Sequence, residues 1–327
     1  SLSASSQVRA QALAELHRLS QGPTGAAPAA FPAADPWGWP GAREWTHSPE
    51  PIRPTDQPVQ LSPSGLSSMS QCQLRWFLER QVKAGANDNP AAIFGTVIHA
   101  AISDLITQAQ QGQPINAAEA LDRYWAACEH DAQWHAELEK GRAQVAVERA
   151  ANWIAERPGR LVSEHEFATQ IAVAVTDPAA ASDAPHDAAD GIQLIGSIDA
   201  LEVDPVGGAT VWDFKTQSQK TPNAEVAEHL QLQAYQLALQ SGEQAIGVDS
   251  VQGAGLVHVC VPAGAKAPDQ PACGMQPALS LGDTGIAEHL SRAIVSIRAE
   301  EFNAEPGKWC RTCPFAAMCP SQNQQKG

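Results

Sequence analysis

The spacing of hydrophobic and polar residues predicts helices near both ends of this chain and strands through much of its middle. The helical segments repeat apolar residues every three or four positions, and the strand segments are rich in β-branched and aromatic residues. Helices are predicted over 7–20, 64–77, 91–111, 117–128, 134–156, 224–241 and 284–302. Strands are predicted over 161–175, 191–203, 209–215 and 247–261. This order predicts an α/β domain with a mixed central sheet flanked by helices.

Three stretches lack a sustained period and are predicted to be irregular. Residues 23–63 are rich in Pro, Gly, Ala and Trp, so residues 1–60 are interpreted as a helix followed by a linker or wrapping arm. Residues 176–190 are interpreted as a surface hairpin loop, and residues 262–283 as a loop rich in Pro and Gly. Ser64 is the expected N-cap of the first helix of the folded core.

The formal net charge of −15 argues against a surface that binds nucleic acid broadly, because phosphate affinity normally comes from Lys and Arg. A local basic channel is compatible with this charge, although most of the basic residues could equally be ordinary solvated charges. The residues that could line such a channel are Arg75, Arg80, Lys83, Arg142, Arg149, Lys215 and Lys220.

Several classes of protein are disfavoured by what the sequence lacks. It has no G-x-x-x-x-G-K-[ST] motif, so we expect no ATP-driven motor within these residues. No stretch is interpreted as a signal peptide or a membrane span, because the apolar runs are short and interrupted. The chain begins at Ser1 rather than Met, and we interpret it as a fragment or a trimmed form of a longer polypeptide.

The most informative residues are Asp213-Phe214-Lys215, which end a predicted strand. Side chains alternate faces along a strand, so Asp213 and Lys215 should point the same way and Phe214 the other way. A further acid, Asp199, ends the apolar stretch before the preceding turn. Two carboxylates and a lysine that converge suit metal-dependent phosphodiester hydrolysis. The alternative for Asp199 is an ordinary salt-bridged or turn-facing aspartate.

Residues outside the strands add to this pattern. His99 follows Gly95 by four residues in a predicted helix, on the same face as Ile102, so it is either a core histidine or a ligand. Gln231 and Tyr235 lie four residues apart on another predicted helix and therefore share one face. The alternative for this pair is a helix surface with a half-buried tyrosine.

Seven cysteines are too few and too uneven for a disulfide framework. Three of them form a Cys-x2-Cys-x5-Cys cluster near the C-terminus, and Cys72 lies far upstream as a possible fourth ligand. Four thiolates can bind a [4Fe–4S] cluster or Zn²⁺, and the spacing alone does not separate the two. The clustered residues are Cys310, Cys313 and Cys319. Ordinary buried or loop thiols are expected at Cys128, Cys260 and Cys273.

Together, these motifs resemble the PD-(D/E)XK nuclease superfamily. The similarity points to its RecB-like branch and to the iron–sulfur-stapled nuclease modules of AddB and of actinobacterial AdnAB helicase–nucleases. It covers roughly residues 61–320 and implies a restriction-endonuclease-like core with an iron–sulfur-stapled helical extension. The implied organisation is an N-terminal arm (1–60), a nuclease domain (61–320) and a tail (321–327).

The resemblance implies a role for each motif. His99, Asp199, Asp213 and the backbone carbonyl of Phe214 would bind Mg²⁺ or Mn²⁺. Asp199, Asp213 and Lys215 would be catalytic, and Gln231 and Tyr235 would lie near the DNA and order the active site. The cysteine pattern, with Cys72, favours a [4Fe–4S] cluster over zinc, with a structural role.

We therefore expect a metal-dependent DNA nuclease that acts on single-stranded DNA or DNA ends. It would be the nuclease module of a helicase–nuclease in double-strand-break processing, in the bacterial cytoplasm and without a membrane partner. Its motor would lie in the same polypeptide or in a partner helicase subunit. Two alternatives are a stand-alone Cas4-like exonuclease, and a catalytically silent nuclease fold that binds DNA or braces a partner.

Overall fold

The computed structural model of the 327-residue chain describes residues 54, 56–84, 90–125, 133–173, 191–242, 248–280 and 284–323. The chain divides into two compact units, Ser1–Thr55 together with Ala317–Gly327, and Asp56–Ala316. The second unit contains the sheet and the helices that pack on it. The helix predicted over 7–20, most of the predicted arm and the loop predicted over 176–190 lie outside the described residues.

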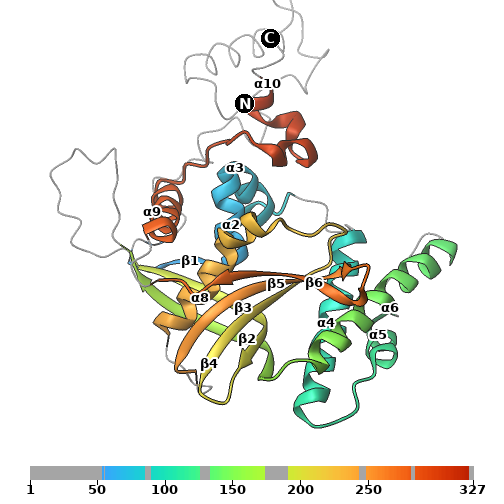
Figure 1. The fold of residues 1–327 in the computed structure, drawn as a ribbon. Coiled ribbons are helices and arrows are strands. Elements are labelled where there is room, and N and C mark those ends of the chain that lie inside the picture. The colour runs from blue at the N-terminus through green and yellow to red at the C-terminus, as the bar shows by residue number, and fades with distance from the viewer. Residues whose placement is uncertain are drawn as a thin grey trace, which may run out of the picture. The chain divides into compact units, whose positions relative to one another are not determined.

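A six-stranded mixed sheet forms the centre of the second unit (Figure 1). Its order is β1-β3-β4-β5-β6, and β2 also pairs with β3. The β1–β3 and β4–β5 pairs are parallel, and the other three pairs are antiparallel. The sequence-based prediction of a mixed sheet flanked by helices is confirmed. The strands are β1 (Val59–Leu61), β2 (Arg160–Ala172), β3 (Gly191–Val203), β4 (Gly208–Lys215), β5 (Ser250–Gly264) and β6 (Ala267–Pro277).

Strand β3 organises the sheet around the position of Asp199. It pairs with β2 along its length except at Asp199, with β1 over Ile192–Leu194, and with β4 only over Ala200–Val203. Asp199 therefore lies at the point where β3 and β4 separate, and its side chain is not enclosed by a further ladder pair.

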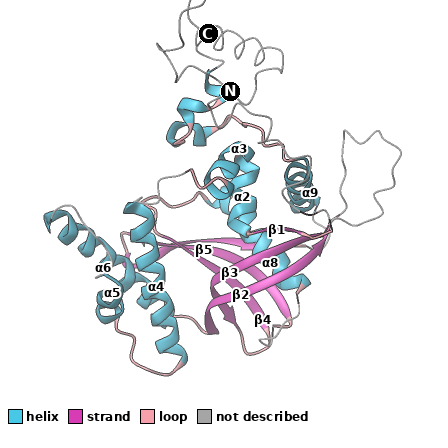
Figure 2. Ribbon diagram, turned by 180° about the vertical axis from the view of Figure 1, so that it is seen from behind, coloured by secondary structure: helices cyan, strands magenta, loops and turns pink. Residues whose placement is uncertain are grey.

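Helices cover both faces of the sheet (Figure 2). One face packs on α4, α5 and α6 through a core that includes the β4 residues Trp212 and Phe214. The β4 residues Ala209 and Val211 belong to a second core, which includes residues of α8. The alternation of β4 side chains thus places its two aromatic rings and its two catalytic candidates on opposite faces. The helices are α4 (Pro90–Gln110), α5 (Ala117–Trp125), α6 (Gln133–Ala155), α7 (Asn223–Ala227), α8 (Leu230–Ser241) and α9 (Thr284–Ala299).

The first helix of the core begins earlier than expected. Its N-cap is Ser62, whose side chain accepts a hydrogen bond from the Gly65 N–H, and Pro63 occupies the first helical position. Pro at this position loses no intrahelical bond, which is why the helix starts before Ser64. Cys72 then adopts an extended backbone and divides the predicted helix into α2 (Pro63–Gln71), α3 (Gln73–Trp76) and the π-helix η4 (Phe77–Gln81).

Helix α4 is long and apolar enough to cross a membrane by length and composition alone. Within this fold, however, its apolar face packs against α5 and α6, and it includes fully buried side chains. The buried residues are Ile98, Ala101, Ile102, Leu105 and Ile106, each at most 1% exposed. Gly112, with φ of +66°, follows the end of the helix as its sequence predicts. Burial of this face identifies α4 as a core helix.

Strand β6 replaces much of the loop that was predicted over 262–283, which is a correction to the sequence analysis. Its residues include three Pro and one Gly and no β-branched residue, so the sequence resembles a loop. Proline is tolerated on an edge strand because the missing N–H would face outwards. Pairing with β5, rather than local propensity, therefore makes this segment a strand.

A buried glutamine of β6 also explains why the helix predicted over 224–241 is broken in two. The Gln276 Nε2 donates hydrogen bonds to the carbonyls of Val226, Ala227 and His229. These carbonyls lie at the end of α7 and the start of the break, where helix carbonyls otherwise lose their partners. The chain resumes as α8 after His229.

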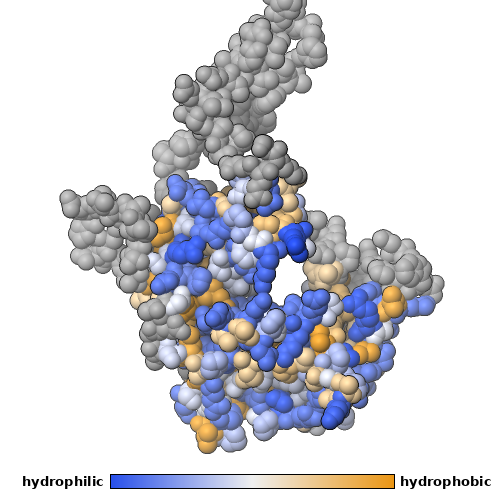
Figure 3. Space-filling model, turned by 45° about the horizontal axis from the view of Figure 1, so that its top comes forward, coloured by the Kyte–Doolittle hydropathy of each residue, from blue (hydrophilic) through white to orange (hydrophobic). Residues whose placement is uncertain are grey.

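The segment after α9 packs on α3. Phe302 stacks on Phe77 with ring centroids 4.5 Å apart, and the Leu74 N–H donates to the Asn303 carbonyl at 3.0 Å. The short helices that follow are η5 (Lys308–Thr312), η6 (Ala316–Met318) and α10 (Pro320–Asn323). Figure 3 shows that hydrophilic residues predominate on one face of the described surface, with hydrophobic ones interspersed.

Candidate active site

Asp213 and Lys215 lie on the same face of β4, as the strand period predicts. The Lys215 Nζ is 2.6 Å from Asp213 Oδ2, and the carboxylate is almost fully buried. Trp212 and Phe214 face the other way, where both rings meet the edge of Trp153. This aromatic packing fixes the strand, and it therefore fixes the direction of the two polar side chains.

Asp199 reaches β4 from the neighbouring strand. Its Oδ2 accepts a hydrogen bond from the Phe214 N–H at 2.8 Å. The β3–β4 connection that sets this register is a turn in which Asp204 Oδ1 accepts the N–H groups of Val206 and Gly208. Those hydrogen bonds, led by that of Gly208, lower the pKa of Asp204. The turn thus places Asp199 and Asp213 beside each other.

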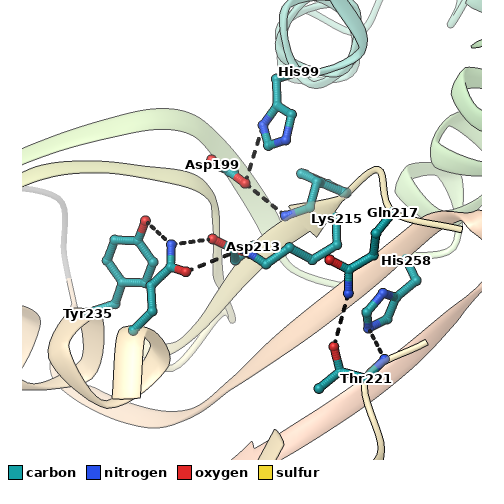
Figure 4. A network of polar contacts seen from close by, with 10 residues as sticks. His99, Asp199, Asp213, Lys215, Gln217, Thr221, Tyr235 and His258 are labelled. Carbon is teal, nitrogen blue, oxygen red and sulfur yellow. Dashed lines mark hydrogen bonds and ion pairs between the residues drawn. The ribbon is translucent and has the colours of Figure 1, made fainter. Parts of the chain in front are cut away.

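His99 approaches the same carboxylate from α4 (Figure 4). Its Nδ1 lies 3.4 Å from Asp199 Oδ2, and its side chain is 31% exposed. Burial lowers the pKa of His99, but the hydrogen bond and charge of Asp199 outweigh burial, so the pKa lies above its ordinary value. His99 is therefore a polar residue of the site rather than a fully enclosed core histidine.

The Gln231 amide holds three groups of the site in one arrangement. Its Nε2 donates to Asp213 Oδ1 at 2.9 Å and to the Tyr235 hydroxyl at 3.1 Å. Its Oε1 accepts from Lys215 Nζ at 3.3 Å. Burial raises the pKa of Tyr235 above its ordinary range, so its hydroxyl stays protonated. Gln231 of the predicted helical pair thus contacts β4 directly, and Tyr235 is linked to β4 through Gln231.

Burial makes the charged form of Asp213 costly. Desolvation raises the pKa of Asp213 to about 6, with a contribution from nearby Asp199, although Lys215 favours the carboxylate. Asp213 Oδ2 has the ion pair with Lys215, but it has no well-aligned hydrogen-bond donor among the described residues. A carboxylate held in this way has room in its coordination for a cation.

Glu164 is a residue of the site that the sequence analysis left unassigned. It lies in β2 across from Asp199, in a left-handed conformation with φ of +47° that interrupts the strand pairing. The Ser197 hydroxyl donates to Glu164 Oε2 at 2.8 Å. A left-handed glutamate costs the fold about 1–3 kcal/mol. Hydrophobic alternation gives no signal for a left-handed residue within a strand, although the acid itself is visible in the sequence.

A cavity of about 730 Å³ adjoins the site, and His99, Glu164 and Asp199 line it. Helix α4 contributes one wall and α5 contributes Tyr124, while Thr216 belongs to the segment that leaves β4. The size falls within the usual range of ligand pockets. The polar residues that line it are Thr96, His99, Ser103, Tyr124, Glu164, Asp199 and Thr216.

The donor set fits a hard divalent cation, although the structure does not present a preformed metal cluster. In the described part of the chain, no group of three or more His, Cys, Asp or Glu side chains is arranged to hold a metal ion. Two neighbouring aspartates and one imidazole nevertheless supply the oxygen and nitrogen ligands that Mg²⁺ and Mn²⁺ prefer. One lysine offsets only part of their negative charge.

The four candidate cluster cysteines are free thiols in the structure. Cys72 is buried at the break between α2 and α3, whereas Cys310 accepts the Gly307 N–H and Cys313 is half-buried. Cys319 belongs to the other compact unit. Within the residues that the structure describes, these thiols do not form a ligand group, so the iron–sulfur assignment rests on the sequence.

Comparison with known families decides the class of the protein. The model of the PD-(D/E)XK nuclease superfamily matches residues 60–320, about four-fifths of the chain. The chain belongs to this superfamily. As a PD-(D/E)XK protein it contains the acid-x-lysine triplet at Asp213-Phe214-Lys215, within the matched range. The search of curated proteins gave no match.

Two solved structures show limited similarity to this PD-(D/E)XK chain. SSO0001 is 13% identical, with a TM-score of 0.41, and the alignment covers 85% of this chain and 91% of that one. A protein named as an exonuclease, from Eubacterium rectale, is 11% identical with a TM-score of 0.40, covering 77% of this chain and 87% of that one. Similarities at this level do not bear on the reaction.

Proposed function

We propose that the protein is a metal-dependent DNA nuclease that hydrolyses phosphodiester bonds in single-stranded DNA or at DNA ends. The observation that carries this proposal is the convergence of Asp199, Asp213 and Lys215 where β3 and β4 separate. This point lies beside a cavity that Asp199 and His99 line. Superfamily membership supports the proposal. A catalytically silent nuclease fold would be expected to lack one of these acids or the lysine. Asp199, Asp213 and Lys215 are all present here.

The residues would divide the work between holding a cation and stabilising charge. His99, Asp199, Asp213 and the Phe214 carbonyl would hold Mg²⁺ or Mn²⁺, which supplies polarisation of the phosphate and of the attacking water when bound. Lys215 would stabilise negative charge that develops on the phosphate oxygens. Gln231 orients Lys215 and Asp213 together, so it acts as a positioning residue.

Two substitutions test the proposal. Asp213→Ala and Lys215→Ala should each abolish Mg²⁺- or Mn²⁺-dependent cleavage of a labelled single-stranded oligonucleotide while the fold, followed by circular dichroism, is retained. Asp249→Ala is the matched control, because Asp249 is an exposed acid just before β5, across from the turn that precedes β4. Wild-type cleavage rates in either site variant would overturn the assignment.

The proposal also includes a [4Fe–4S] cluster held by Cys72, Cys310, Cys313 and Cys319, with zinc as the lesser alternative. The packing of Phe302 and Asn303 on α3 supports it, because the chain enters the cysteine tail directly from this contact next to Cys72. A bound cluster would draw the four cysteines together, since metal binding and folding are coupled. The role of the cluster would be structural.

In the cell, we propose that this domain works as the nuclease module of a helicase–nuclease in DNA end processing, in the bacterial cytoplasm. Residues 1–60 would form an arm that connects it to a motor in the same polypeptide or to a partner helicase subunit. Residues 61–320 would form the nuclease domain. Co-purification of a helicase with the full-length protein would support this context, and full processive end degradation by the domain alone would contradict it.

A further inference from the structure

The segment that leaves the catalytic strand is exposed but anchored at both ends. Thr216 lies against α4, because a β-carbon added at Gly95 would lie 3.3 Å from its hydroxyl oxygen. At the other end, the Thr221 N–H donates to His258 Nε2 at 3.3 Å, and the Gln217 amide donates to the Thr221 hydroxyl (Figure 4). The residues between these anchors, Gln217–Lys220, are all exposed.

His258 is an unusual residue for its place in the sheet. It is fully buried in β5 between Val257 and Val259, directly across from Lys215 in the β4–β5 register. Burying an imidazole is costly unless its polar atoms are used. Within the described residues, its Nδ1 has no hydrogen-bond partner, so the bond to Thr221 is the interaction that explains a histidine here.

The charge state of His258 suits this anchor. Burial, together with the positive charges of Lys220 and Lys215, lowers the pKa of His258 to about 4. The imidazole is therefore neutral near pH 7, and Nε2 is free of a proton and able to accept the Thr221 N–H. Lys220 immediately precedes the anchored Thr221, so it lies at this end of the segment.

We propose that Gln217–Lys220 contacts the DNA backbone beside the active site and that His258 holds this segment in place. This inference rests on the nuclease function proposed above and gives the place where the bound DNA strand would lie. The segment begins at Thr216, which lines the catalytic cavity, and it consists of amide, hydroxyl and ammonium side chains. Amide, hydroxyl and ammonium groups bind phosphates. On a chain with a net charge of −15, surface segments that carry such groups without acids are scarce.

The test is equilibrium binding of a fluorescein-labelled single-stranded oligonucleotide in EDTA, where binding is independent of cleavage. Lys220→Gln should raise the Kd several-fold and reduce the dependence of log Kd on log salt by about one charge. His258→Leu should raise the Kd by a similar factor. His258→Gln, whose side-chain oxygen can accept the Thr221 N–H, should restore binding.

A double-variant cycle separates anchoring from unrelated damage. If His258 acts by placing Lys220, the Lys220→Gln/His258→Leu protein should bind DNA no more weakly than whichever single variant has the higher Kd. Arg160→Gln is the charge control, because Arg160 opens β2 opposite Val203, before the turn that precedes β4, whereas the segment follows the other end of that strand. Its Kd should stay at the wild-type value.

Three results with the variants would overturn the inference: a wild-type Kd for Lys220→Gln, multiplied effects in the double variant, or equal weakening by Arg160→Gln. Lys220 is exposed, so its replacement should not disturb the fold. The Kd of Lys220→Gln therefore decides the question even if His258→Leu fails to fold. A wild-type protein that binds DNA with these variant effects but does not cleave it with Mn²⁺ would overturn the proposed function and leave the inference standing. Absence of any binding by the wild-type protein would overturn the inference.

Discussion

Replacing Asp213 by Asn should stabilise the metal-free protein while it abolishes cleavage. Asp213 is 3% exposed, and burial raises its pKa from 3.8 to about 6. A carboxyl group whose pKa is higher in the folded than in the unfolded protein stabilises the fold at pH values below its pKa in the unfolded chain. That support is lost as the pH rises through the folded value. The charged carboxylate should therefore cost the folded wild type about 3 kcal/mol at pH 8.

The isosteric amide carries no charge, so the Asp213→Asn protein should escape this cost. Its free energy of unfolding in EDTA should exceed that of the wild type by up to about 3 kcal/mol at pH 8. About half of this advantage should appear between pH 5 and pH 8, because the loss begins near the unfolded pKa. Urea unfolding at the two pH values measures the difference.

Asp249→Asn is the matched control, since its carboxylate is exposed and its removal should change the free energy of unfolding little at either pH. Mn²⁺ should then stabilise the wild type and not the Asp213→Asn protein, because only the wild type gains a cation ligand there. The reasoning would be refuted if Asp213→Asn were less stable than the wild type at pH 8, or if the difference did not change with pH.

Three further substitutions make separate predictions. His99→Ala should shift the Mn²⁺ dependence of cleavage to higher concentration, about 10- to 100-fold; an unchanged metal midpoint with a lower melting temperature would show that His99 only packs. Glu164→Gly should relieve the left-handed strain and raise the free energy of unfolding by about 1 kcal/mol while it lowers the cleavage rate, and a less stable variant would show that the backbone is not strained. Cys72→Ser should lower iron and sulfide content and the melting temperature together, and full cluster occupancy at an unchanged melting temperature would exclude Cys72 as a ligand.

The sequence predicts the elements whose pattern is carried by their own side chains. The strand predicted over 191–203 coincides with β3, and the helix predicted over 91–111 ends one residue beyond α4. The shared face of Asp213 and Lys215 follows from strand alternation alone and is confirmed by their ion pair. The prediction that Gln231 and Tyr235 share a helix face is likewise confirmed by their hydrogen bond.

The features that the sequence did not predict depend on contacts between distant segments. Strand β6 exists because it pairs with β5, and the break between α7 and α8 is occupied by Gln276 from that same strand. The left-handed conformation of Glu164 occurs where β2 faces Asp199, so it depends on pairing with the distant strand β3. His258 looks like one more polar residue in a buried strand until the segment after Lys215 folds back over it. Local periodicity contains no information about such contacts.

The most direct test of the account is the initial rate of cleavage of a labelled single-stranded oligonucleotide by the metal-free wild-type protein as Mn²⁺ is added. The account predicts no cleavage in EDTA and a saturable rise in rate with Mn²⁺, which should be absent from the Asp213→Asn protein. Cleavage that persists in EDTA, or no cleavage at any Mn²⁺ concentration, would contradict the claim that Asp199, Asp213 and Lys215 form a metal-dependent nuclease site.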